Sequence, residues 1–175
     1  MTQILRQSQE IMNIFDQAMD IEKEGEALYR KFSLDASDEG MKRVFTWLAD
    51  QERKHYEIFK KMKAGKSASI EESTILHDVK DIFAGWKDIA GNIVVKVSEA
   101  DLYRRALDSE NKSVLVYENY AKDSATGQQK GIFLSIAKEE KRHRWILGNI
   151  IEFVTKPEVW VENAEFDHLE EDYYL

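Results

Sequence analysis

The chain has 175 residues, of which 43% are hydrophobic, so it is long enough to bury the core of one compact domain. A net charge of −8 disfavours nucleic acid and anionic membranes as partners, and the lack of cysteine excludes disulfides, iron-sulfur clusters and thiol catalysis. No stretch reaches the roughly 18 apolar residues of a membrane span, and the first residues lack the apolar core of a signal peptide. We therefore expect a single cytoplasmic domain over residues 1–175.

Two helices are predicted in the first half of the chain. Apolar residues recur every three or four positions from about residue 8 to residue 34, which is the period of one helix face, and a second such run covers about 39–63. The turn between them, SLDASDEG, is short and offers Ser37 and Asp38 as N-caps. Because the connection is short, we predict that the two helices form an antiparallel hairpin.

The second half follows after a long crossover. Residues 64–98 contain one short amphipathic piece around DVKDIFAGW, and helices are predicted at about 99–124 and 128–154, before Pro157. Residues 155–175 form a tail whose aromatic residues are expected to dock against the bundle or a neighbouring subunit. Two antiparallel hairpins joined by a long crossover predict an all-α, ferritin-like four-helix bundle with a C-terminal tail.

An internal repeat supports this topology. When the sequence is shifted by 88 residues, many positions of the first hairpin match the second hairpin without an insertion. The two hairpins are therefore predicted to be related by an approximate two-fold axis. The matched pairs are Ala18 and Ala106, Asp20 and Asp108, Glu22 and Glu110, Tyr29 and Tyr117, Phe45 and Phe133, Ala49 and Ala137, Glu52 and Glu140, and His55 and His143.

The repeated glutamates and histidines have the spacing of a metal site. Residues three apart share a helix face, so Glu52 with His55, and Glu140 with His143, each present an oxygen and a nitrogen toward one point. Four glutamates and two histidines form the donor set of di-iron and di-manganese carboxylate bundles, and they suit iron or manganese better than copper. The predicted ligands are Glu22, Glu52, His55, Glu110, Glu140 and His143.

The Glu-x-x-His motif alone is weak evidence for a metal site, because Glu165-x-x-His168 also has this spacing and the chain is rich in acidic residues. Such a pair can simply lie on a solvated face of a helix. The equal offset of the other two pairs, and one glutamate on the helix before each pair, favour a dinuclear metal site. The tail pair has no such helix, and its role is left open. Tyr29 and Tyr117, on the predicted ligand faces, either pack in the core or hydrogen-bond a ligand carboxylate.

These residues resemble the rubrerythrin-like branch of the ferritin-like superfamily, in its erythrin-type form without a rubredoxin domain. The resemblance covers about residues 10–154 through AMDIEKEGEALY, FTWLADQERKHYEIF, ALDSENKSVLVY and FLSIAKEEKRHRWIL, and WVENAEF in the tail looks similar. It implies two iron ions, with manganese or a mixed pair as variants. The implied roles are terminal carboxylates for Glu22 and Glu110, bridging carboxylates for Glu52 and Glu140, and one metal each for His55 and His143.

The resemblance implies a non-haem di-iron protein that reduces hydrogen peroxide in defence against oxidative stress. Because the chain has no cysteine, electrons would come from an external, rubredoxin-like donor protein. Alternatives are a ferroxidase or iron-binding protein of bacterioferritin type and a dioxygen-dependent oxidase, and the aromatic tail favours a homodimer over a large shell. Rubrerythrins have an extra glutamate where this chain has Ser113, and the repeat position holds Gly25. This departure favours a symmetric six-ligand set and predicts room for a small oxidant.

Overall fold

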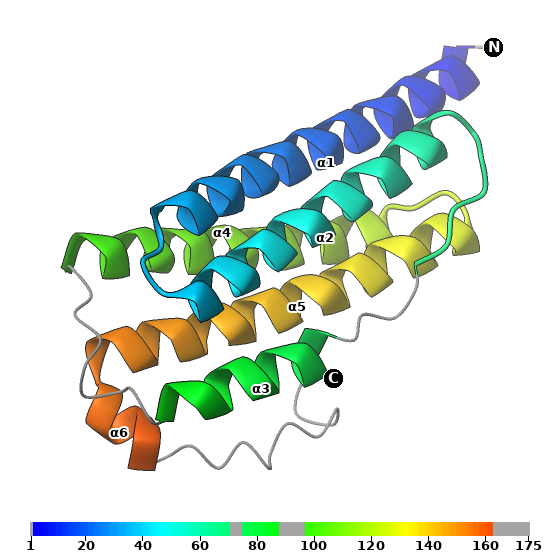
Figure 1. Ribbon diagram of the computed structural model, residues 1–175. Helices are drawn as coiled ribbons and strands as arrows, with labels where there is room; N and C mark the ends of the chain where they lie inside the picture. Colours follow the sequence, from blue (N-terminus) through cyan, green and yellow to red (C-terminus); the bar gives the residue numbers. More distant parts are fainter. Residues whose placement is uncertain (1, 71–74, 88–96, 163–175) are drawn as a thin grey trace. The chain divides into compact units, whose positions relative to one another are not determined.

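The computed structural model describes residues 2–70, 75–87 and 97–162, and the regular structure in these ranges is entirely helical (Figure 1). No helix in the described ranges is long and apolar enough to cross a membrane. The helices are α1 (Thr2–Asp35), α2 (Glu39–Lys63), α3 (Ile75–Lys87), α4 (Val97–Lys122), α5 (Gly127–Thr155) and α6 (Pro157–Glu162).

The chain divides into two compact units, and α4 and α5 contribute to both. The first unit comprises Met1–Glu71 and Leu115–Ala137, so it contains α1, α2, the end of α4 and the start of α5. The second unit comprises Glu72–Val114 and Lys138–Leu175, so it contains α3, the start of α4, the end of α5, and α6.

The ends of α2 follow from local side-chain chemistry. Asp38 is the N-cap, in an extended conformation, and its carboxylate accepts a hydrogen bond of 2.8 Å from the backbone N–H of Met41. At the other end Gly65 has a φ of +68°, where glycine is favoured, and its N–H donates to the carbonyl of Met62 at 2.9 Å. Helix α2 therefore begins after a residue that favours a helix start and ends beside a glycine that favours a helix end.

The first unit is a four-helix core. Helices α1 and α2 lie side by side and antiparallel (Figure 1). Phe15 of α1 stacks on Phe133 of α5 with ring centroids 5.9 Å apart. The ring of Phe59 of α2 lies 5.4 Å from that of Phe133 and 5.4 Å from that of Tyr117, which belongs to α4. One aromatic side chain from each helix therefore meets in the core, and the predicted all-α, ferritin-like bundle is confirmed.

The second unit has an aromatic core of its own. Trp86 of α3 stacks on Phe153 of α5 at 4.6 Å, and Trp160 of α6 lies 4.9 Å from the same ring. Phe83 lies 4.8 Å from Trp86. These rings fix α3 and α6 against α5 (Figure 1). The aromatic tail was expected to dock, and Trp160 does so within the chain, whereas residues 163–175 lie outside the described ranges.

Some helix boundaries differ from the sequence expectations. Helix α1 begins at Thr2 rather than near residue 8, and the amphipathic piece DVKDIFAGW of the crossover lies within the longer helix α3. Helix α5 ends at Thr155, before Pro157 as predicted, but Pro157 also opens α6. Proline is tolerated at the first position of a helix, where its missing N–H would have no partner within the helix. One residue therefore separates α5 from α6.

Candidate metal centre

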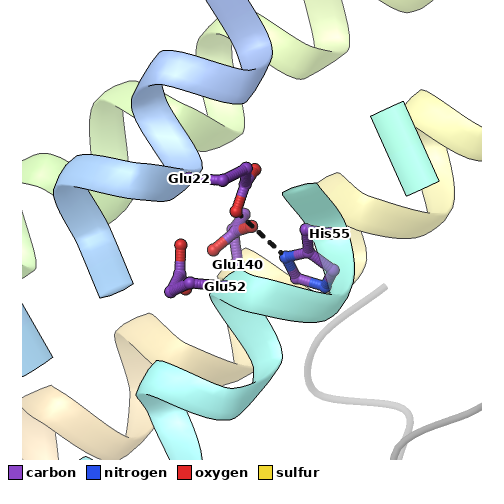
Figure 2. A group of neighbouring side chains, drawn as sticks. All are labelled: Glu22, Glu52, His55 and Glu140. Carbon is purple, nitrogen blue, oxygen red and sulfur yellow. Dashed lines mark ion pairs between the residues drawn. The ribbon is translucent and has the colours of Figure 1, made fainter. Parts of the chain in front are cut away.

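In the first unit, three of the predicted ligands come together. Glu22 lies on α1, Glu52 and His55 lie on α2, and their side chains turn toward one another in Figure 2. All three residues are buried, with exposed fractions of 0%, 4% and 2%. Nδ1 of His55 lies 3.4 Å from Oε2 of Glu22. The hairpin of α1 and α2 therefore places two carboxylates and an imidazole in one buried group.

The second unit repeats this group with the predicted ligands of the other hairpin. Glu110 lies on α4, Glu140 and His143 lie on α5, and all three are buried. Nδ1 of His143 lies 3.0 Å from Oε2 of Glu140 and 3.8 Å from Oε1 of Glu110. In both units, Nδ1 faces the carboxylate of the preceding bundle helix, which the 88-residue repeat predicts.

Within each unit, the predicted ligands lie close enough to hold one ion. Glu22, Glu52 and His55 each offer a ligand atom, and these three atoms all lie within 4.8 Å of one another. In the second unit, one ligand atom each from Glu110, Glu140 and His143 meets the same limit.

The donor atoms also fit a divalent ion chemically. Two ligand atoms bound to one ion at about 2.1 Å each are separated by about 3.0–3.4 Å, depending on geometry. The separations of 3.4 Å at His55 and 3.0 Å at His143 agree with this range, whereas 3.8 Å at Glu110 is wider. Within each unit, two carboxylates balance one divalent charge, and burying such carboxylates without a counter-charge would be costly.

A tyrosine contacts the group in the first unit. The hydroxyl of Tyr117 donates a hydrogen bond to Oε1 of Glu22, and both residues are fully buried. Tyr117 therefore has the hydrogen-bonding position that the sequence offered as one of two possibilities. Its repeat partner Tyr29 is buried on α1, with its ring 6.3 Å from that of Phe32. Its predicted contact with a ligand carboxylate stays a prediction.

Two features near the ligands were missed by sequence reasoning. A Cβ atom on Gly25 would lie 2.6 Å from Oε2 of Glu52, so the space beside Gly25 that was expected for a small oxidant holds the carboxylate of Glu52. Arg142 and Glu139 form a buried ion pair on α5, each 4% exposed. In a helix rich in charged residues, a Glu-x-x-Arg spacing resembles a solvated pair. The signal that could have found it is its position beside Glu140 and His143.

The residues of the third Glu-x-x-His motif, Glu165 and His168, lie outside the described ranges.

Comparison with known proteins points to one family. The family model for rubrerythrin matches residues 13–87 and 101–170, which include all six predicted ligands and both tyrosines. The chain has no significant match among curated proteins or among solved structures. The match covers most of the chain, so this protein belongs to the rubrerythrin family of ferritin-like di-iron proteins.

Proposed function

We propose that this protein is a non-haem di-iron peroxidase that reduces hydrogen peroxide with electrons from an external donor protein. The observation that supports it best is the repeated buried group of two glutamates and one histidine, with Nδ1 of the histidine turned to a carboxylate in each unit. Family membership supports the di-iron centre.

The six predicted ligands would hold two ions. His55 with Glu22 would hold one ion, and His143 with Glu110 would hold the other. Glu52 and Glu140 would be shared between the two ions, which is the bridging role that the family resemblance implies. Carboxylate oxygens with two imidazoles suit iron, and manganese or a mixed pair is the chemical alternative.

Two bound ferrous ions would supply one electron each, which together with two protons converts hydrogen peroxide into two waters. The residues of this chain would prepare the site for that chemistry. The hydroxyl of Tyr117 donates a hydrogen bond to Glu22 and so holds this carboxylate in one orientation. Burial of all six ligands keeps bulk water away, which strengthens the attraction between the carboxylates and a cation.

We propose that the electrons come from a separate rubredoxin-like protein. The chain has no cysteine and cannot itself build a four-cysteine iron site. We also propose a homodimer. Light scattering on the metal-loaded protein should give the mass of two chains, whereas a mass near that of a 24-subunit shell would favour iron storage.

A bacterioferritin-type ferroxidase is the second candidate. The observation that favours it is the six-residue ligand set, in which Ser113 and Gly25 stand where an additional glutamate would extend the ligands. Both residues lie one turn after the ligand of their helix, and Ser113 is buried. A dioxygen-dependent oxidase shares this ligand set and is a third outcome of the same test.

The test begins with protein purified without oxygen and loaded with ferrous iron. We expect two irons per chain, and oxidation that is much faster with one equivalent of hydrogen peroxide than with dioxygen, followed by the near-ultraviolet absorption of the ferric product. Equal or faster oxidation by dioxygen would replace the peroxidase with a ferroxidase or oxidase.

Two histidine variants test the ligand assignment with a matched control. His55→Ala and His143→Ala should each lose one iron or bind it much more weakly, because each removes one nitrogen ligand. His168→Ala belongs to the third Glu-x-x-His motif and should keep both irons. Loss of iron in His168→Ala with retention in the other two would overturn the assignment.

A further inference from the structure

We propose that Gly25 is a positioning residue for the carboxylate of Glu52, and that its missing side chain is a requirement for tight metal binding. This inference rests on the proposed metal centre. It concerns a residue that carries no ligand atom in its side chain and that lies between the ligand Glu22 and the tyrosine Tyr29 on α1. Its evidence comes entirely from the first unit.

Gly25 faces Glu52 at very short range. It lies three residues after Glu22, so the two positions share one face of α1. A Cβ atom on Gly25 would lie 2.6 Å from Oε2 of Glu52, 3.1 Å from its Cδ and 3.3 Å from its Cγ. The first distance is well inside the roughly 3.5 Å of an ordinary contact between heavy atoms. The carboxylate of Glu52 therefore lies in the volume that any larger residue at position 25 would need.

Backbone conformation does not explain this glycine. Gly25 lies inside α1, and among the described glycines only Gly65 has a positive φ. Glycine within a helix lowers helix stability relative to alanine, so a position with ordinary helical geometry has no local reason to keep it. The helical glycines Gly131 and Gly148 meet no atom within 4 Å of an added Cβ. The close approach of Glu52 is thus specific to Gly25.

A side chain at position 25 would act on the metal centre through Glu52. The atom in conflict is the end of a flexible side chain, so the fold can tolerate a methyl group if the carboxylate rotates away. Rotation would move a carboxylate that offers a ligand atom within 4.8 Å of those of Glu22 and His55 in the same unit. Displacing groups that orient metal ligands typically weakens metal affinity by about 10- to 100-fold. We expect Gly25→Ala to lie in that range.

The first experiment is anaerobic equilibrium dialysis of ferrous iron against wild type, Gly25→Ala and Gly131→Ala. Gly131→Ala is the matched control, because it makes the same change in a helix of the same unit where the new methyl group meets open space. Wild type and Gly131→Ala should bind with equal affinity, and Gly25→Ala about 10- to 100-fold more weakly. Wild-type affinity in Gly25→Ala would overturn the inference.

A second experiment uses the metal-free protein and keeps the test independent of the proposed function. In a Glu52→Ala background, Gly25→Ala should raise the urea midpoint as Gly131→Ala does, because the space is then empty and alanine favours the helix. In the wild-type background this gain should be absent or reversed. An equal shift in both backgrounds would overturn the contact between Gly25 and Glu52. If wild type binds no iron, the proposed function fails while this double-mutant cycle still decides the contact.

Discussion

The six predicted metal ligands are buried at positions where an ordinary helix would carry apolar residues. Burying a carboxylate without a compensating partner costs several kcal/mol, so each of these groups needs a hydrogen bond, an ion pair or a cation. In the first unit, Oε1 of Glu22 accepts a hydrogen bond from the hydroxyl of Tyr117, and its Oε2 lies 3.4 Å from Nδ1 of His55. A buried hydroxyl beside a ligand therefore contributes both to the stability of the unit and to the orientation of the carboxylate.

Removing the hydroxyl of Tyr117 tests this contribution. In Tyr117→Phe, the carboxylate of Glu22 loses a donor in a fully buried position, and leaving a buried acceptor unsatisfied costs about 1–3 kcal/mol. We expect the free energy of unfolding of the metal-free protein to fall by about this amount, measured by urea denaturation.

Tyr120→Phe provides the control one turn further along α4. The hydroxyl of Tyr120 donates to Oε1 of Gln17 at 2.6 Å near the surface, where water can replace it. We expect a loss below about 1 kcal/mol there. Equal losses in the two variants would contradict a special role for the buried hydrogen bond to Glu22.

At the scale of helices, an N-cap fixes the residue at which a helix begins. Helix α2 begins directly after Asp38 and has buried residues along one face, with the predicted ligands Glu52 and His55 among them. The same face carries the core residues Phe45 and Phe59. A helix that begins at a defined residue holds both ligands at a defined height beside α1.

Substituting the cap should weaken α2. In Asp38→Ala, the N–H of Met41 loses its carboxylate acceptor, which typically lowers the free energy of unfolding by about 0.5–2 kcal/mol. Asp35→Ala is the control, since Asp35 ends α1 and caps no helix start. Chemical denaturation followed by circular dichroism measures both. An undiminished stability in Asp38→Ala would show that water caps this helix equally well.

For the whole molecule, each hairpin supplies one group of two carboxylates and one imidazole. Any ion that binds these groups in the folded state but not in the unfolded chain stabilises folding by mass action. The expected gain is about 2.7 kcal/mol when free metal exceeds its dissociation constant a hundredfold. Metal loading should therefore change the stability of the protein as well as its reactivity.

Metal removal is the corresponding prediction. Treatment with a chelator should lower the melting temperature measured by scanning calorimetry, and adding back ferrous iron without oxygen should restore it. In His55→Ala the difference between loaded and metal-free protein should be smaller, because one ligand is missing. A melting temperature that is unchanged by chelation in wild type would contradict metal binding to these groups.

Much of the candidate centre was accessible from the sequence. The period of the apolar residues defined the helices, because burial of one face requires that period, and the 88-residue repeat distinguished two Glu-x-x-His pairs from the third. Helical spacing also placed Glu52 beside His55 and Glu140 beside His143. These are local relations, since residues a few positions apart on a regular helix have a geometry that the sequence alone specifies.

The tertiary structure decided the contacts between residues that are distant in the chain. It showed that Nδ1 of each histidine faces the carboxylate of another helix, that Tyr117 donates to Glu22, and that the carboxylate of Glu52 occupies the space beside Gly25. Such contacts depend on how far each helix is rotated and shifted against its neighbour. That arrangement is set by the packing of many side chains together, and no short stretch of sequence contains it.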